Sequence, residues 1–199
     1  MKLKRIPAGV YAANCYILMD EETRETVIID PGGDAEDLKS AIEELKCVVK
    51  YILLTHGHVD HTGAVSELSK YYSVPFGINE KDEKMALSNQ FMYGLFYKKA
   101  DFNLSQGDIF KIGNKEIKCI ETPGHTQGGM CFLIDNMLFT GDTLFSSSIG
   151  RTDLAGGDFE DIIESIKTKL ITLPEDTIVL PGHGAESTIK REKMHNPFL

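Results

Sequence analysis

The sequence predicts an α/β protein in which two mixed β-sheets pack together and are flanked by helices on both sides. Short apolar runs rich in β-branched residues fall into two groups along the chain. Segments with helical spacing lie between and around these groups. The length of 199 residues suits one domain, which buries roughly 70% of the unfolded surface. We therefore expect residues 1–199 to form a single domain.

The first elements alternate between strand and helix. Residues 15–19 and 26–29 are expected to form a hairpin around the polar turn at residues 20–24. The Pro-Gly-Gly sequence at 31–33 ends the second strand, and Asp34 is expected to cap the following helix. The buried face of that helix is predicted from apolar residues at helical spacing: Leu38, Ala41, Ile42 and Leu45.

The middle of the chain continues the alternation. We expect a strand at residues 48–54, a helix at residues 62–72 and a short strand at residues 74–78. Residues 81–99 are helical in period and contain several aromatic residues. They are expected either to wall a substrate pocket or to pack on the core as a helical hairpin.

The second half is mostly strand, with one helix at residues 159–170. The expected strands are residues 116–121, 129–134, 137–140 and 177–180. A tight turn at Asp135-Asn136 joins two of these strands into a hairpin. No internal repeat or linker divides the chain.

Composition excludes several classes of function. The formal net charge of −9 offers no basic footprint for phosphate backbones, so no nucleic-acid partner is expected. No signal peptide and no apolar run of about 18 residues is recognisable, which predicts a cytoplasmic protein without a membrane partner. The sequence does not indicate an oligomeric state. Four cysteines without a C-x-x-C pair predict buried free thiols in a reducing compartment: Cys15, Cys47, Cys119 and Cys131.

The positions of the histidines carry the strongest functional signal. Five of the six histidines lie in Gly- or Pro-marked turns directly after expected strands, and Asp142 has the same setting. Side chains in such turns are positioned by the backbone and can converge at one edge of a sheet sandwich. The five are His56, His58, His61, His125 and His183.

This combination of side chains indicates a metal site. Imidazole and carboxylate suit zinc, iron and manganese, and no thiolate occurs in these turns. In an extended backbone His56 and His58 project to the same side and can hold one ion. Asp60 and His61 lie one step further on and can face a neighbouring ion. A single histidine such as His195 is more often a surface residue, but a cluster this dense is hard to explain structurally.

The ordered motifs resemble those of the metallo-β-lactamase superfamily, and most closely its glyoxalase II-like branch of small hydrolases. The motifs are T-H-G-H-V-D-H at 55–61, P-G-H-T at 123–126, G-D-T-L-F at 141–145 and P-G-H-G at 181–184. A D-P-G turn at residues 30–32 also matches the family pattern. The resemblance extends from about residue 13 to residue 198.

The resemblance implies an αβ/βα four-layer sandwich with two divalent metal ions at one edge. Zinc is the first expectation, and iron and manganese are the alternatives. By the family pattern the first metal is held by His56, His58 and His125, the second by Asp60, His61 and His183. Asp142 would bridge the ions, Asp60 and His183 would also be catalytic, and Asp30 would orient the H-x-H loop.

The implied activity is hydrolysis of a small acyl-thiol, such as S-lactoylglutathione, by a hydroxide between the metals. Lactam-cleaving relatives usually lack the aspartate seen here as Asp60 or carry cysteine in place of Asp142. Relatives with a redox diiron centre carry glutamate in place of His58 and an additional flavin-binding domain.

Two alternatives remain open. One is a sulfur (persulfide) dioxygenase with a single iron, held by His56, His125 and Asp142. The other is a metal-binding module without catalytic activity. Glutathione itself is also open, because the helical domain that supplies basic residues in glyoxalase II is missing. Only a short basic segment follows His183, with Lys190, Arg191 and Lys193.

Overall fold

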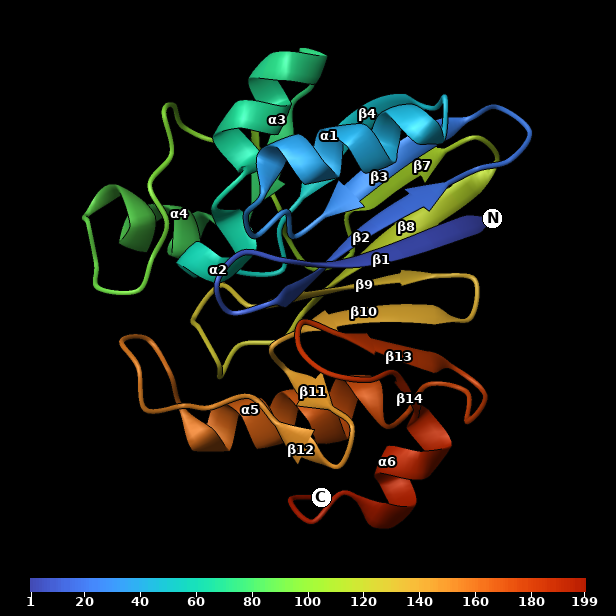
Figure 1. Cartoon of the computed structure of the whole chain (residues 1–199). Coiled ribbons are helices and arrows are strands. Elements are labelled where there is room, and N and C mark those ends of the chain that lie inside the picture. Colours follow the sequence, from blue (N-terminus) through green and yellow to red (C-terminus); the bar gives the residue numbers. More distant parts are fainter.

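Two six-stranded sheets face each other in the computed structural model, which describes residues 1–199 (Figure 1). In spatial order the first sheet contains β1 (Lys2–Ala8), β2 (Ala13–Met19), β3 (Glu25–Ile29), β4 (Val48–Leu53), β5 (Phe76–Ile78) and β6 (Phe102–Asn103). The second contains β14 (Ser187–Thr188), β13 (Ile178–Pro181), β10 (Met137–Gly141), β9 (Met130–Ile134), β8 (Lys115–Glu121) and β7 (Ile109–Ile112). A separate two-stranded ribbon pairs β11 (Leu144–Phe145) with β12 (Ser148–Ile149).

Both sheets are mixed, as predicted. The strands β1, β2 and β3 are antiparallel, whereas β3 to β6 run parallel. In the second sheet only β10 and β13 are parallel. The predicted turn at Asp135-Asn136 joins β9 to β10, and Asp135 adopts the left-handed conformation with φ 51°. Aspartate tolerates this conformation better than most residues, which fixes the hairpin at this point.

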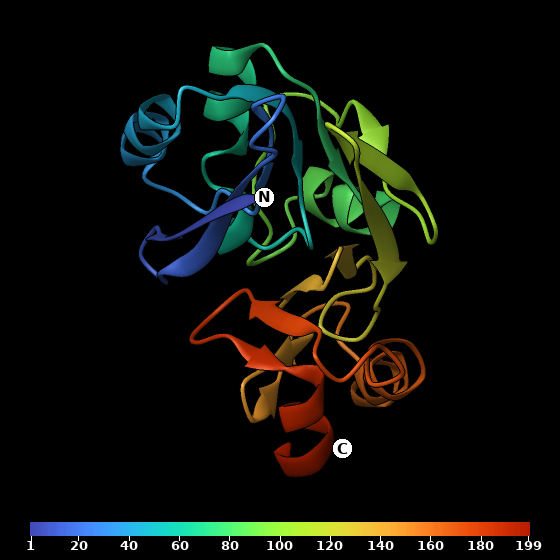
Figure 2. The same cartoon turned by 90° about the vertical axis from the view of Figure 1, so that its right-hand side faces the viewer.

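Helices cover the outer faces of both sheets and complete four layers (Figures 1 and 2). On the first sheet lie α1 (Ala35–Glu44), α2 (Val59–Thr62), α3 (Val65–Tyr72) and α4 (Glu80–Leu87). On the second lie α5 (Phe159–Ser165), its π-helical continuation η1 (Ile166–Leu170) and α6 (Ile189–His195). The four-layer sandwich expected from the motifs is therefore confirmed.

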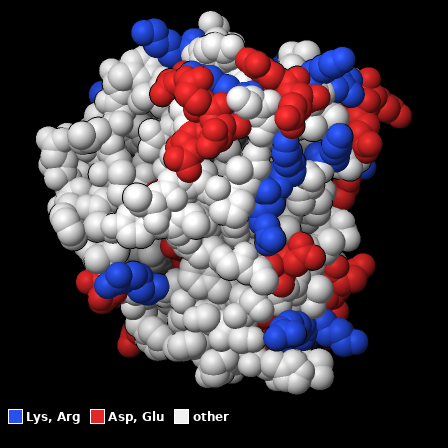
Figure 3. Space-filling view, in the orientation of Figure 1, with Lys and Arg blue, Asp and Glu red and all other residues white.

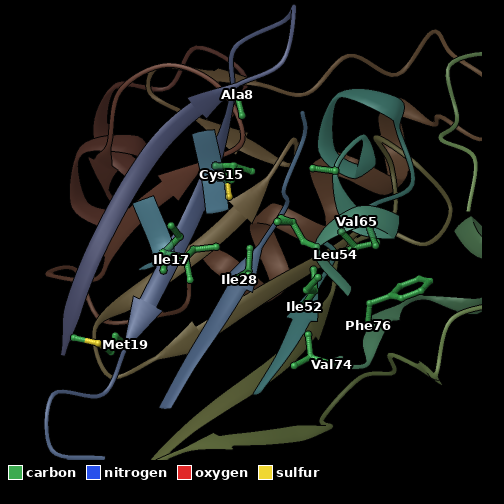
Figure 4. Close-up of a cluster of buried hydrophobic side chains, with 14 of the residues drawn as sticks. Ala8, Cys15, Ile17, Met19, Ile28, Ile52, Leu54, Val65, Val74 and Phe76 are labelled. Carbon is green, nitrogen blue, oxygen red and sulfur yellow. The ribbon is translucent and has the colours of Figure 1, made fainter. Parts of the chain in front are cut away.

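Three apolar cores separate the four layers. In β2 the side chain of Ile17 faces the core beneath α1 and α3, which Figure 4 shows. The next residue, Leu18, faces the core between the two sheets. A third core lies between the second sheet and α5, and includes Leu138 and Ile162. Because both faces of the central strands are buried, their sequences are continuously apolar rather than alternating.

The structure corrects two local predictions. The helix expected at residues 62–72 begins later, at Val65, as α3, and a separate four-residue helix, α2, precedes it, with Gly63 and Ala64 between the two. Asp34 lies at the N-cap position of α1, as expected, but its side chain makes no capping bond, because its carboxylate accepts a hydrogen bond from Gly9 N at 2.8 Å instead. At Asp34 φ is 50°, so its side chain does not bond to the N–H groups of the helix.

Several elements were not predicted, namely β1, β6, β7, β11, β12, β14 and α6. β1 and β7 are edge strands of their sheets and are largely exposed. Their polar residues therefore hide the apolar pattern by which a strand is predicted. All four cysteines are free; Cys15, Cys119 and Cys131 are buried, as predicted, whereas Cys47 is only partly buried. No helix combines the length and apolar character that a membrane span requires.

Candidate metal centre

The predicted site residues all lie on turns or short helices that directly follow strands. The first group comes after β4, where the chain enters α2. The others come after β8, β10 and β13. The structure brings all seven residues together between the edges of the two sheets: His56, His58, Asp60, His61, His125, Asp142 and His183.

The first cluster, here called the histidine trio, consists of His56, His58 and His125. One potential ligand atom from each of the three lies within 4.8 Å of the others. Nδ1 of His58 and Nε2 of His125 are 2.9 Å apart. All three side chains are buried. The trio therefore combines the turn after β4 with the turn after β8.

The second cluster, here called the mixed trio, consists of Asp60, His61 and His183. Nε2 of His183 lies 3.2 Å from Oδ2 of Asp60 and 3.3 Å from Nε2 of His61. His61 is fully buried, but the side chain of His183 is 31% exposed and that of Asp60 is 14% exposed. The mixed trio is thus the half of the centre that solvent reaches.

Asp142 lies between the trios. Its Oδ1 is 3.3 Å from Nε2 of His61, in the mixed trio. Its Oδ2 is 3.6 Å from Nε2 of His125, in the histidine trio, and 3.7 Å from Nε2 of His183. A carboxylate in this position can contact two ions at once.

The donor set fits metal ions by distance and by unsatisfied atoms. Two ligands of one tetrahedral zinc lie roughly 3.3–3.4 Å apart, since each is about 2.0–2.1 Å from the ion. The shortest distances within the mixed trio and to Asp142, 3.2–3.3 Å, lie close to this value, and the others reach 3.8 Å. Nε2 of His56 and Oδ1 of Asp142 are buried and have no hydrogen-bond partner. Buried polar atoms without partners are costly, and cations at the two trios would satisfy both.

Neighbouring groups leave Nε2 of three histidines free to bind a metal. The carbonyl of Arg151 can only accept, so Nδ1 of His125 must donate to it, at 2.8 Å. The Asp30 carboxylate likewise requires a proton on Nδ1 of His61, at 3.0 Å. The Thr55 hydroxyl donates to Asp30 and is therefore the acceptor for Nδ1 of His56, at 3.1 Å. Such contacts orient ligands and select the tautomer.

Asp30 is close enough to His56 and His61 to be a third possible metal group. Its carboxylate is already used, however, because it accepts from Thr55 N at 2.7 Å and from the Thr55 hydroxyl at 2.5 Å. The bond to His61 adds a third contact. Asp30 therefore holds the start of the H-x-H turn, and its contacts match the orienting role expected from the sequence.

The electrostatics of the two trios differ. Burial lowers the pKa of His56 well below its ordinary value, and lowers the pKa of His58 to about 4. Burial also acts to lower the pKa of His61, but the carboxylates of Asp142 and Asp30 outweigh it and raise that pKa. Contact with Asp60 raises the pKa of His183. In the histidine trio, burial thus favours neutral His56 and His58, whereas the mixed trio contains ion pairs.

A cavity of about 490 Å³ opens onto the centre. Besides five of the seven site residues, it is lined by Tyr11, Met92, Phe145, Ser148, Ile149, Arg151 and Leu154. Arg151 is the one cation in this lining apart from histidine, and its guanidinium contacts the Asp153 carboxylate through two bonds of 2.7 Å. The cavity wall beyond the metal centre is therefore mainly apolar.

The segment 81–99 is helical only as far as Leu87, at the end of α4, so the expected helical hairpin is wrong, although the segment does contribute to both the cavity and the core. Met92 lines the cavity. Tyr93 packs its ring edge-on against His58, with centroids 4.9 Å apart, and pairs with it through a backbone bridge. Phe96 packs against the core beneath the helices instead. His195 is exposed at the end of α6, as expected, and lies outside the site.

One residue beside the centre was missed by sequence reasoning. Asp82, in the first turn of α4, is fully buried and accepts hydrogen bonds from Gly57 N and Gly128 N. Its position in the first turn of an acidic helix gave no signal, because charged residues there usually face solvent. The glycines at 57 and 128 were the available clue, since each allows a close approach of this carboxylate.

The sequence is similar to those of known proteins. A family model described as the metallo-beta-lactamase superfamily matches residues 8–183. The hydroxyacylglutathione hydrolase GloC of Haemophilus influenzae is 42% identical over 210 residues, covering 100% of this chain and 98% of that protein.

Solved structures agree on the fold and differ in their described functions. BLEG-1, described as a B3 metallo-beta-lactamase, has a TM-score of 0.92 and 38% identity, and covers 100% of this chain and 99% of its own. TTHA1623 in a di-iron-bound form has a TM-score of 0.82 and 32% identity, with 98% and 100% covered. ETHE1 from Myxococcus xanthus has a TM-score of 0.86 and 28% identity, with 99% and 84% covered.

Proposed function

The chain belongs to the metallo-β-lactamase superfamily, and on that premise we propose that it is a binuclear metal-dependent hydrolase of small acyl-thiols. The observation that carries the proposal is the convergence of two ligand trios on the shared carboxylate of Asp142. A mononuclear site would leave one complete trio without a role.

The proposed ligands follow the geometry. The histidine trio would hold the first ion, the mixed trio the second, and Asp142 would contact both. Two bound divalent cations would supply a water of lowered pKa and would polarise the substrate carbonyl. Zinc suits this set of imidazoles and carboxylates, and the di-iron form of TTHA1623 makes iron the main alternative.

The chain's own residues would orient the substrate. Asp60 and His183 line the cavity from its solvent-exposed side, so we assign them contact with the reacting group in addition to metal binding. The apolar wall, with Phe145 and Leu154, would exclude water from the acyl group. His125 is held rigidly by its bond to the Arg151 carbonyl, which keeps Nε2 directed at the centre.

The thiol carrier is a separate part of the proposal. The name of GloC supports glutathione as the carrier. The cavity, however, offers only Arg151 to the carboxylates of glutathione, and Asp153 already neutralises it. In Figure 3 the left-hand side of the face, where α4 and the following segment lie in Figure 1, is largely uncharged. We therefore propose that the enzyme recognises the acyl group more than the carrier.

The first experiment combines elemental analysis of the purified protein with hydrolysis of two lactoyl thioesters. One is S-lactoylglutathione, and the other carries the same acyl group on the neutral thiol N-acetylcysteamine. About two metal equivalents and turnover of both esters at similar kcat/KM are expected. Turnover of the glutathione ester alone would contradict the proposed carrier tolerance, and absence of bound metal after reconstitution would overturn the proposed centre.

Two other activities are tested with the same preparation. The likeness to ETHE1 favours a persulfide dioxygenase as the second candidate, which would show one iron per chain and oxygen uptake on glutathione persulfide. Because the chain is similar to BLEG-1, a chromogenic β-lactam is tested as a further substrate. Hydrolysis of the lactam faster than of either thioester would replace the proposed substrate class. Two bound metals without any turnover would favour a non-catalytic module.

A further inference from the structure

A buried carboxylate lies behind the histidine trio and has no part in the proposed function. Asp82 is fully buried on α4. Its partners are backbone groups: Oδ2 accepts from Gly57 N at 2.8 Å and Oδ1 accepts from Gly128 N at 2.7 Å. Burial of a carboxylate is costly unless it is hydrogen-bonded, and the N-terminal turn of a helix favours negative charge. Both conditions are met at Asp82.

The two N–H groups belong to the two turns that carry the histidine trio. Gly57 lies between His56 and His58, and Gly128 is the third residue after His125. Both glycines are needed for space. A Cβ on Gly128 would lie 2.6 Å from Oδ1 of Asp82, and one on Gly57 would lie 3.3 Å from the Asp82 Cβ. One carboxylate thus spans the gap between the turns.

We propose that Asp82 is the positioning residue of the histidine trio. By holding both turns, it fixes the 2.9 Å separation between Nδ1 of His58 and Nε2 of His125 before any ion binds. Asp82 is not among the residues that line the cavity, so it acts through the two turns rather than on substrate. This inference rests on the proposed metal centre.

Other contacts confine the effect of Asp82 to this trio. The bases of the two turns are joined independently, because Met130 N donates to the Thr55 carbonyl at 2.8 Å. Asp30 also holds Thr55 through two hydrogen bonds. In the mixed trio, His61 is oriented by Asp30. Loss of the Asp82 carboxylate should therefore leave the sheets and the mixed trio in place.

The chain provides a matched control in the next residue. Glu83 is also a buried carboxylate on α4, and it accepts from Ala100 N at 2.6 Å and from Asn103 Nδ2 at 3.3 Å. These contacts hold the segment after α4 and do not reach the metal-binding turns. Asp82→Asn and Glu83→Gln make the same chemical change, since each replaces one acceptor oxygen with an N–H₂ group.

The test measures zinc affinity by chelator competition in proteins that retain a single trio. In a His183→Ala background, which keeps the histidine trio, Asp82→Asn should weaken zinc binding roughly 10–100-fold. It should also change the absorption spectrum of the cobalt-substituted protein. In a His125→Ala background, which keeps the mixed trio, Asp82→Asn should change affinity less than about 2-fold. Glu83→Gln should have no effect in either background.

Three results would overturn the inference. The first is unchanged affinity in the His183→Ala background. The second is equal weakening in both backgrounds, which would indicate general loss of structure. The third is an equal effect of Glu83→Gln at a matched loss of melting temperature. A parent protein that binds no metal would overturn the proposed function itself, which distinguishes that failure from failure of the role of Asp82.

Discussion

The two trios share Asp142 but are built on different principles. The histidine trio is buried, and burial lowers the pKa of His56 and His58. Its turns are held by hydrogen bonds from their backbone N–H groups to the Asp82 carboxylate. The mixed trio is partly exposed and is held by contacts between carboxylates and imidazoles. Packing therefore prepares one half of the centre, and charge prepares the other. The halves should respond differently to mutation and to pH.

The largest effect should come from the residue that both halves share. Asp142→Asn removes the charge that lies 3.3 Å from Nε2 of His61 and 3.6 Å from Nε2 of His125. It should therefore weaken the binding of both ions. We expect kcat/KM for the thioester to fall on the order of 10³-fold, with reduced metal content. Steady-state kinetics and elemental analysis measure this, with the exposed His195→Ala as the control. Full metal content and normal turnover would show that Asp142 is not shared.

The next largest effect separates the trios. His58→Ala should remove the ion of the histidine trio, and His183→Ala should remove that of the mixed trio, so each variant should retain about one equivalent. Cobalt substitution should give a different absorption spectrum for each variant, because one trio contains only imidazoles and the other contains a carboxylate. Loss of both equivalents in either single variant would mean that the two trios bind metal as one unit.

Much of the arrangement of the ligands could be predicted from the sequence. The residues 55–61 place four of the ligands within seven positions, so the neighbourhood of both trios is local. The other three ligands lie in glycine turns after strands, which sets their direction through the backbone. The parallel pairing of β10 with β13 brings two of these turns, at Asp142 and His183, to the same edge.

The hydrogen bonds that hold the trios in place could not be predicted from the sequence. The roles of Asp82 and of the Arg151 carbonyl depend on contacts between segments that are 46 and 26 residues apart. The break between α2 and α3 also depends on tertiary contacts, because Ala64 N donates to the Pro31 carbonyl at 2.9 Å. A Cβ on Gly63 would lie only 2.5 Å from the Gly32 carbonyl oxygen. Periodicity alone therefore predicts a helix that begins at residue 62 rather than at Val65.

Two glycines allow a finer test of the comparison. A Cβ on Gly57 would lie 2.8 Å from Cδ1 of Tyr93, which packs on the histidine trio. A Cβ on Gly182 would lie 2.2 Å from Oδ1 of Asp142 and 2.6 Å from Cε1 of His61. Gly57→Ala and Gly182→Ala should each lower stability by about 1–3 kcal/mol. Thermal unfolding measures this loss, which should be similar in the two variants.

Metal binding should distinguish the glycine variants. Gly57→Ala should weaken metal binding at the histidine trio, and Gly182→Ala should weaken metal binding at the mixed trio. Chelator competition measures both affinities. Gly184→Ala is the control, because φ there is +75° but no atom lies within 4 Å of the added Cβ, so strain arises without displacement of a ligand. Metal loss in that variant as well would attribute the effects to instability alone.

The smallest effect is the difference in pH dependence between the trios. A metal can bind an imidazole only after its proton has left. The raised pKa of His61 and His183 means that these groups retain protons to higher pH, whereas His58, with its pKa lowered to about 4, is already deprotonated. As pH falls at fixed, subsaturating zinc, the mixed trio should therefore lose its ion first. Equilibrium dialysis of His58→Ala and His183→Ala between about pH 5 and 8 measures this. The protein that retains the mixed trio should show the steeper decline, and equal curves would mean that the carboxylates offset the cost of releasing those protons.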